Sequence, residues 1–328
     1  MTDPTRVPKG RIIGPVGTRV EVGDARSAAL GHLIDYAGLF PPASREMEGA
    51  VAGYRAARTG SAAWIAGRFL CPTSRLEELA GLLTATMTAD EDPWEVGAVF
   101  DEEPGIAASH TATFHRYTDP AARITSAEAG ISHGAGRAEI ETIFKAAASI
   151  TAEVVPFLEV PRTEAWEEEI PIVVDHIADT RTDWRRNGGA KIRCGGLGPT
   201  AFPSPEQVAC FIIACTRRGL PFKATAGLHH PVRHWDEDLD VMRHGFLNLL
   251  LATAVAAEAD DVPFHEVAAV VAERDASAFS VGAGSIAYRD HRFPIRSVAA
   301  VRTSGFTAYG SCDFQEPVSD LVSMGAVV

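Results

Sequence analysis

The sequence lacks long apolar runs, paired cysteines and a surplus of positive charge, and each absence excludes a class of protein. Its 328 residues contain no uncharged apolar stretch of about 18 residues, which excludes a membrane-spanning helix. Residues 1–26 are polar with scattered Arg and Pro, so we expect no secretory signal. The 30 basic and 43 acidic residues give a net charge of −13, which argues against a general nucleic-acid binder.

Cysteine usage and missing motifs narrow the possibilities further. The chain has five cysteines, an odd number, and none of them forms a CxxC pair, which argues against a structural zinc site. We therefore expect a reduced, cytoplasmic protein. The chain contains no GxxxxGK[ST], GxSxG or HExxH motif and no full GxGxxG after a convincing strand, so nothing specific indicates nucleotide binding.

What the chain does contain is a repeated order of a short β-rich run followed by a longer helical segment. We predict strands over residues 33–40, 63–70, 94–100, 123–130, 152–160, 190–194, 221–228 and 245–251. Helical periodicity lies between them, for example over 74–87, 137–148, 167–178 and 204–218. Strands joined by helical crossovers run parallel, and eight such units favour a closed (β/α)8 barrel of the TIM type over an open doubly wound sheet. The predicted divisions are an N-terminal leader over 1–28, the barrel over 29–257, and a C-terminal helix with a capping tail over 258–328.

Lysine is rare in this chain, and its placement is informative. Of the 30 basic residues 26 are Arg, and the four lysines are Lys9, Lys145, Lys191 and Lys223. Lys9 lies in the polar leader and Lys145 in a helical segment, where solvent exposure explains them. Lys191 and Lys223 lie in predicted strands, where a solvated cation is unexpected.

The two strand lysines predict amine chemistry if they face the barrel interior. Side chains alternate along a strand, so Lys191 shares a face with Arg193, and Lys223 shares a face with Thr225. Two adjacent buried ammonium groups repel each other, which lowers a pKa and leaves an amine able to form a Schiff base with a carbonyl. In the alternative, each lysine is an ion-pair partner, or the strands face the other way.

Three motifs around these lysines and Asp35 also resemble a known family. The runs Leu33-Ile-Asp-Tyr-Ala-Gly-Leu-Phe-Pro-Pro, Lys191-Ile-Arg-Cys-Gly-Gly and Phe222-Lys-Ala-Thr-Ala-Gly-Leu are similar to the first, sixth and seventh strands of deoxyribose-phosphate aldolases, which are class I aldolases. The two lysines stand in the same order as in that family, 32 residues apart.

The resemblance implies a carbon–carbon lyase acting on a small carbonyl substrate. Lys191 would be the Schiff-base nucleophile, Lys223 its electrostatic partner and Asp35 a polar group on the first strand. The family also carries an acid on a middle strand, for which Glu159 is the candidate proton shuttle. The family's phosphate-binding eighth strand is missing, with His244-Gly-Phe-Leu-Asn-Leu in its place, so a phosphorylated substrate is not implied.

Several further groups at predicted strand ends are candidates for binding the substrate. These are Arg68, Arg193, Thr225, His229, His230, Gly195 and Gly196. We expect no cofactor, no nucleic-acid partner and no membrane partner, and a homo-oligomer is left open.

Two other functions stay open from the sequence. A divalent metal would be held by members of a histidine cluster, His229, His230, His234 and His244, and would make the chain a metal-dependent lyase, isomerase or hydrolase. A barrel that binds a small molecule without catalysis is the third reading, and outward-facing lysines would favour it.

Overall fold

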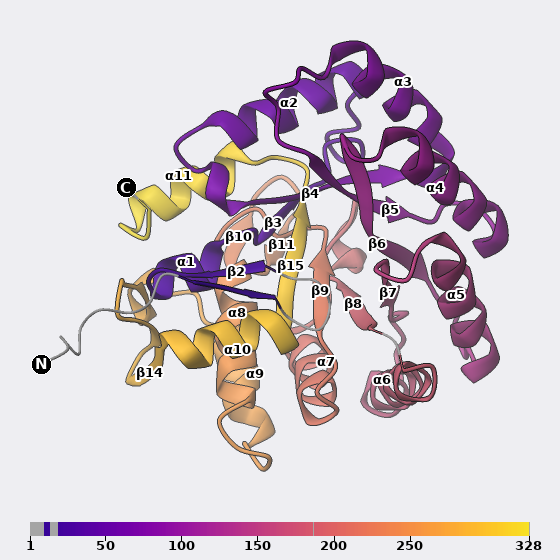
Figure 1. Ribbon diagram of the computed structural model, residues 1–328. Helices are drawn as coiled ribbons and strands as arrows, with labels where there is room; N and C mark the ends of the chain where they lie inside the picture. The colour runs from indigo at the N-terminus through magenta and orange to yellow at the C-terminus, as the bar shows by residue number, and fades with distance from the viewer. Residues whose placement is uncertain (1–9, 14–18, 186, 328) are drawn as a thin grey trace, which may run out of the picture.

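The computed structural model describes residues 10–13, 19–185 and 187–327, and eight parallel strands in it close into a barrel. The strands follow one another in chain order, and the last of them, β15, closes the barrel between β9 and β3 (Figure 1). They are β3 (Ile34–Tyr36), β4 (Ala66–Pro72), β5 (Trp94–Val99), β6 (Ala122–Gly130), β7 (Val155–Glu159), β8 (Gly189–Arg193), β9 (Phe222–Thr225) and β15 (Phe306–Ser311). The predicted TIM-type barrel is confirmed.

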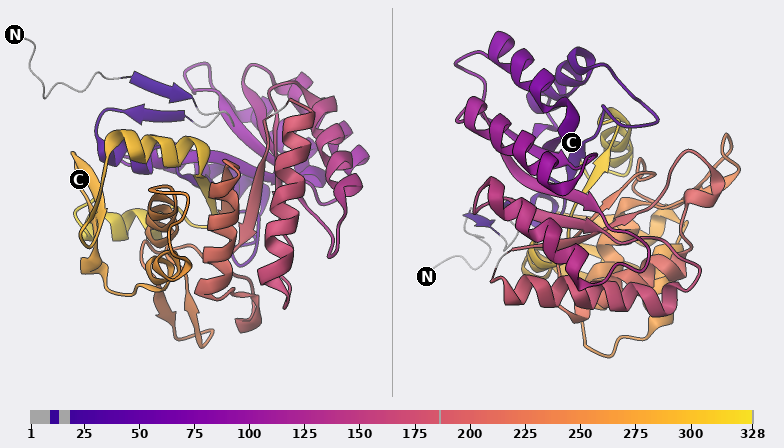
Figure 2. Two further views of the ribbon diagram at one scale, coloured as in Figure 1. Left: turned by 90° about the horizontal axis from the view of Figure 1, so that it is seen from below. Right: turned by 90° about the vertical axis from the view of Figure 1, so that its right-hand side faces the viewer.

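Helices surround the barrel as the β-then-helix pattern requires (Figures 1 and 2). Those joining its first seven strands are α2 (Met47–Thr59), α3 (Leu76–Thr86), α4 (Pro104–Thr118), α5 (Arg137–Ile150), α6 (Trp166–Asp183) and α7 (Pro205–Arg217). None of the helices in the described ranges has the length and apolar character that a membrane span requires.

Helix α7 begins with a capping box, whereas α3 begins without a side-chain cap. At α7 the Ser204 side chain accepts from the backbone N–H of Gln207 at 3.3 Å, and the Gln207 side chain accepts from the Ser204 N–H at 2.8 Å. At α3, Thr73 and Ser74 do not cap the helix. Their hydroxyls donate to Asp101 at the end of the neighbouring strand β5, at 2.7 and 2.5 Å.

The eighth barrel strand is not the segment that we predicted. Gly245 precedes α8 (Phe246–Ala256), and residues 246–251 form the first part of that helix, every residue of which is buried. The strand that closes the barrel is β15, which is also fully buried. A continuous apolar run does not distinguish a buried helix from a buried strand, which is the reason for the error. The barrel therefore reaches residue 311, well into the predicted capping tail.

The segment between β9 and β15 is a long insertion built of small elements. The hairpin of β10 (His234–Asp236) and β11 (Val241–Arg243) precedes α8, and α9 (Phe264–Ala272) follows it. A three-stranded antiparallel sheet of β12 (Phe279–Val281), β13 (Ser285–Tyr288) and β14 (His291–Pro294) then leads into α10 (Ile295–Ser304). After β15, the last helix or strand of the described residues is α11 (Gln315–Ser323).

The described part of the predicted leader is also folded. The strands β1 (Gly10–Ile13) and β2 (Arg19–Val22) pair antiparallel, and α1 (Ala25–Leu30) begins where the Asp24 carboxylate accepts from the Ser27 N–H at 2.7 Å. Both β2 and α1 pack against α10, as the left view of Figure 2 shows. Residues 1–9, with Lys9, lie outside the described residues.

Small residues in the barrel strands leave room for large polar side chains. A Cβ on Gly67 would lie 2.5 Å from Oδ1 of Asp35, and a Cβ on Gly97 would lie 2.9 Å from Oγ of Ser126. Asp35 uses that room to accept from the backbone N–H of Arg68 at 2.7 Å. The sequence thus provides space for a buried polar cluster at the carboxyl ends of the strands.

Candidate active site

Lys191 and Lys223 lie directly opposite each other on neighbouring barrel strands. Their Cα atoms are register partners between β8 and β9, and the residues are only 5% and 1% exposed. Lys223 also lies over the ring of Phe157 on β7, with Nζ 5.4 Å from the ring centroid. Both ammonium groups are therefore held inside the barrel near its carboxyl-terminal mouth, where TIM barrels place their reactive groups.

Glu128 on the fourth barrel strand, β6, joins the two lysines. Its Oε2 lies 2.9 Å from Nζ of Lys191, and its Oε1 accepts a hydrogen bond from Lys223. The Glu128 residue is 1% exposed. A buried carboxylate costs several kcal/mol unless charges of opposite sign surround it, and the two ammonium groups meet that requirement here.

Each lysine has a second carboxylate partner on its other side. Glu159 lies 3.0 Å from Nζ of Lys191 and accepts from Nε of Arg193 at 2.8 Å. Asp35 lies 2.5 Å from Nζ of Lys223. The result is a chain of alternating charge that runs from the first barrel strand to the mouth, where the Arg193 side chain is 52% exposed.

Arg68 extends the same network on the side of Asp35. Its Nη1 lies 3.8 Å from Oδ1 of Asp35, and its Nε donates to Thr125 Oγ1 at 2.9 Å. The structure therefore brings together six of the predicted site residues, namely Asp35, Arg68, Glu159, Lys191, Arg193 and Lys223.

The carboxylates reverse the expected effect of two adjacent ammonium groups. Burial lowers the pKa of Lys191, but Glu128 and Glu159 outweigh burial and raise that pKa to about 12. Burial raises the pKa of Glu128, but Lys191 and Lys223 outweigh it and hold that pKa at about 2. The expectation of a lowered pKa at Lys191 is therefore wrong for the resting protein. Both lysines are ion-paired, as one of the sequence alternatives states.

These pKa shifts predict how the free energy of unfolding depends on pH. Glu128 has its ordinary pKa at 4.5, so its stabilising contribution is complete above that value and is lost as the pH falls through about 2. Lys191 acts in the opposite direction, since its contribution is complete below its ordinary pKa of 10.5 and is lost as the pH rises through about 12.

The free energy of unfolding at acid pH can be measured directly. Urea unfolding from pH 7 down to pH 2 should show a loss of about 3 kcal/mol that belongs to Glu128. The Glu128→Gln variant should start less stable at pH 7 and lack that part of the acid loss. An acid dependence that is identical in the two proteins would contradict the assignment.

The other predicted binding residues lie on the loops and strand ends beside this cluster. Thr225 is the register partner of Arg193 on β9. Gly195 packs where the loops after β8 and β9 meet, since a Cβ there would lie 2.7 Å from the Phe202 ring and 3.0 Å from Cα of Gly227. A Cβ on Gly196 would lie 2.7 Å from the Ala201 side chain. A side chain at either position would collide with a neighbouring residue, which accounts for both glycines.

The predicted histidine cluster does not converge on one metal position. His229 Nδ1 lies 2.8 Å from Glu316, and His230 Nδ1 lies 2.5 Å from Asp320. The His234 ring packs edge-on against His230, with centroids 4.1 Å apart. His244 is buried apart from these contacts, with Nε2 2.8 Å from the Pro203 carbonyl oxygen. Across residues 10–13, 19–185 and 187–327, no group of three or more His, Cys, Asp or Glu is placed to hold a metal ion.

Sequence reasoning missed Glu128, the residue at the centre of the cluster. The sequence predicts the strand 123–130 but no site residue on it. The signal was a single carboxylate in an otherwise small and apolar run, Ser126-Ala-Glu-Ala-Gly. Cys312 and Glu316 were also missed, because they follow a barrel strand that was predicted as tail.

Comparisons with known proteins add no family assignment. A scan of the chain against protein-family models and a search among curated proteins found no match. The geometry of the residues and the three aldolase-like motifs are therefore the basis on which a function can be proposed.

Proposed function

We propose that the protein is a class I aldolase-like carbon–carbon lyase that forms a Schiff base between Lys191 and a small carbonyl substrate. The observation that carries the proposal is Glu128, which joins two register-paired lysines inside the barrel. The aldolase resemblance implies an acid on a middle strand in addition to Lys191, Lys223 and Asp35. Glu128 lies on the fourth strand of eight and supplies a carboxylate at that place.

Lys191 is the better nucleophile of the two lysines because it lies closer to a group that can carry a proton out of the site. Its partner Glu159 has a side chain that is 18% exposed, whereas the Lys223 partners Asp35 and Glu128 are almost fully buried. Burial raises the pKa of Glu159, and Lys191 and Arg193 lower it below its ordinary value. Glu159 is therefore proposed as the proton shuttle, and Glu128 as the fixed counter-ion of Lys223.

The reaction begins with removal of the extra proton from Lys191. Glu159, whose carboxylate lies 3.0 Å from Nζ and is partly exposed, is the proposed relay by which that proton reaches solvent, and the neutral amine that remains attacks the substrate carbonyl carbon. The oxygen of the former carbonyl leaves as water and a positively charged imine remains. The bond between the carbons α and β to the imine carbon then breaks: its electron pair forms an enamine, the β-hydroxyl gives its proton to Glu159, and the β-carbon leaves as an aldehyde. Protonation of the enamine and hydrolysis of the imine release the second product and free Lys191. Lys223 stays paired with Asp35 and Glu128 while the charge on Lys191 changes.

Reductive trapping tests this proposal on a panel of small aldehydes and ketones. Sodium borohydride reduces an imine to a stable secondary amine, so borohydride together with a substrate should inactivate the enzyme, whereas either reagent alone should not. A Lys145→Met variant is the matched control, since Lys145 is an exposed lysine on α5. Substrates that are turned over yet give no borohydride-dependent inactivation would refute the Schiff base.

A further inference from the structure

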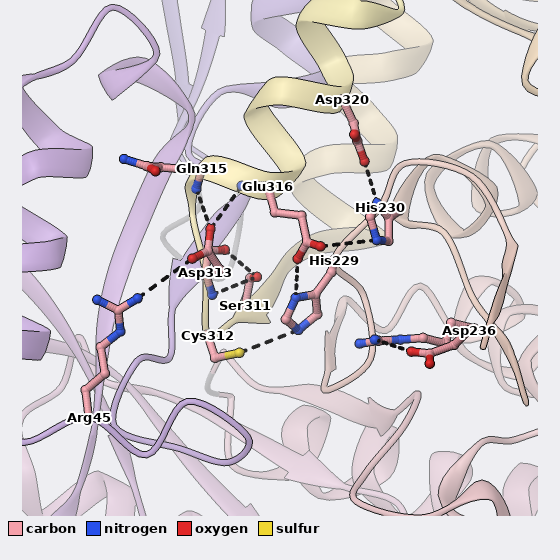
Figure 3. A network of polar contacts seen from close by, with 11 residues as sticks. Arg45, His229, His230, Asp236, Ser311, Cys312, Asp313, Gln315, Glu316 and Asp320 are labelled. Atoms are coloured by element: carbon pink, nitrogen blue, oxygen red, sulfur yellow. Dashed lines mark hydrogen bonds and ion pairs between the residues drawn. The ribbon is translucent and has the colours of Figure 1, made fainter. Parts of the chain in front are cut away.

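A second group of reactive side chains lies over the same mouth of the barrel, at the ends of β9 and β15 (Figure 3). Cys312 follows β15, and its Sγ lies 3.5 Å from Nε2 of His229 in the loop after β9. Nδ1 of the same ring lies 2.8 Å from Oε2 of Glu316 in the first turn of α11. The three side chains thus stand in the order thiol, imidazole, carboxylate.

The start of α11 fixes the carboxylate end of this group. Asp313 accepts from the backbone N–H groups of Gln315 at 2.7 Å and Glu316 at 2.9 Å, which holds the first turn of the helix in place. On its other oxygen, Glu316 lies 3.3 Å from Nε2 of His230. The orientation of Glu316 toward His229 is therefore built into the fold rather than left to a free side chain.

The contacts of His229 determine where its proton lies. A carboxylate accepts hydrogen bonds only, so Nδ1 beside Glu316 carries the hydrogen, and the Nε2 lone pair faces the sulfur. Burial raises the pKa of the Cys312 thiol above its ordinary value, and Asp313 and Glu316 add to the rise against the backbone N–H groups of Ala43 and Cys312, so the resting sulfur keeps its proton. His229 is therefore placed to take the proton from the thiol as the sulfur attacks, and the attack needs no preformed thiolate.

We propose that Cys312, His229 and Glu316 form a second nucleophilic centre, in which the Cys312 thiol adds reversibly to a small aldehyde. His229 takes the proton from Sγ, and the sulfur electron pair forms a bond to the aldehyde carbon. The π electrons of the carbonyl move to its oxygen, which then takes the proton from Nε2 of His229. The product is a thiohemiacetal, and the step needs no oxidant, cofactor or leaving group.

The burial of the two reacting groups and their position favour this class of electrophile. Cys312 is 7% exposed and His229 is 9% exposed, which leaves little access for an extended acyl chain or a peptide. An aldehyde is a product of carbon–carbon cleavage by an aldolase, so the choice of aldehyde depends on the proposed function. The nucleophilic character of Cys312 does not depend on it.

Alkylation with iodoacetamide tests whether the thiol is activated. At pH 7 we expect Cys312 to react first, ahead of the half-buried Cys210, whose sulfur faces the backbone oxygen of Trp166. His229→Asn should slow the alkylation of Cys312 at least about tenfold, because the base is removed. The matched control His234→Asn, from the same histidine cluster, should leave the rate nearly unchanged.

The pH profile of the unaltered protein gives a second readout that does not require a variant to fold. Burial lowers the pKa of His229 below its ordinary 6.5, against the opposing effect of Glu316, while Arg243 and His230 add to the lowering. The alkylation rate of Cys312 should therefore rise through a titration below about pH 6.5 and stay high at neutral pH. A rate that rises only with the ordinary ionisation of a thiol, or one that His229→Asn leaves unchanged, would overturn the activated thiol.

Acetaldehyde then tests the ligand class. It should protect Cys312 from iodoacetamide, and dialysis should reverse the protection. With acetaldehyde labelled by carbon-13 at the carbonyl carbon, a thiohemiacetal resonance should appear and should be absent from Cys312→Ser.

The two proposals fail separately in these assays. Protection in the Lys191→Arg variant, together with no borohydride trapping in the unaltered protein, would reject the Schiff base and keep the thiol site. An activated Cys312 that acetaldehyde does not protect would overturn the aldehyde site, whatever the outcome at Lys191.

Discussion

The Lys191→Arg variant is expected to lose carbon–carbon lyase activity by about 10³-fold or more and to lose borohydride-dependent inactivation completely. Arginine keeps the positive charge that Glu128 and Glu159 require, but its guanidinium stays protonated at neutral pH and cannot attack a carbonyl. The loss should therefore appear in kcat of a folded protein. Steady-state kinetics with any substrate from the trapping panel measure kcat, and a circular dichroism melt measures whether the variant is folded.

Two comparisons separate this result from a purely structural role of Lys191. Lys145→Arg removes an exposed amine and should change neither activity nor stability. A Lys191→Arg protein that keeps activity within about tenfold would show that the amine of Lys191 is not the nucleophile.

The largest effect on stability is expected from Lys223→Met. Lys223 is 1% exposed and neutralises both Asp35 and Glu128, so its removal leaves two buried carboxylates short of a cation. Removing one member of a buried ion pair costs about 3–5 kcal/mol, and urea unfolding at pH 7 should show a loss of that size. Lys145→Met, at an exposed position, should change the free energy of unfolding by less than about 0.5 kcal/mol.

A second variant distinguishes lost charge balance from lost packing. Adding Glu128→Gln to Lys223→Met removes one of the uncompensated charges and should recover part of the lost stability. If the double variant is less stable than Lys223→Met alone, then the ion pair of Glu128 with Lys191 matters more than the charge left uncompensated, and lost charge balance does not explain the effect of Lys223→Met.

The barrel and the two lysines could be predicted because both follow from local patterns. Alternating strand and helix periods define a parallel sheet, and a lysine in a strand of an arginine-rich chain is conspicuous without any structure. The period of two and the adjacent strands predicted that the two lysines meet if both face inward, and the structure adds the inward orientation and the register that pairs Lys191 with Lys223.

The charge state of the site could not be predicted because it depends on residues far apart in the chain. Glu128 contacts Lys223, which lies 95 residues away in the chain, and no local sequence pattern predicts such a contact. Two adjacent lysines alone predict a lowered lysine pKa, whereas Glu128 and Glu159 raise the pKa of Lys191. Similarly, the Cys312–His229 contact exists only because β15, and not residues 245–251, closes the barrel beside β9.

Mass spectrometry of the borohydride-reduced protein tests the proposed Schiff base at Lys191 most directly. The chain has only four lysines, so peptide mapping after reduction in the presence of a substrate assigns the modified amine without ambiguity. We predict that the mass of the reduced substrate is found on Lys191, with Lys145 and Lys223 unmodified. A substrate that is cleaved at full rate while Lys191 stays unmodified would contradict the account.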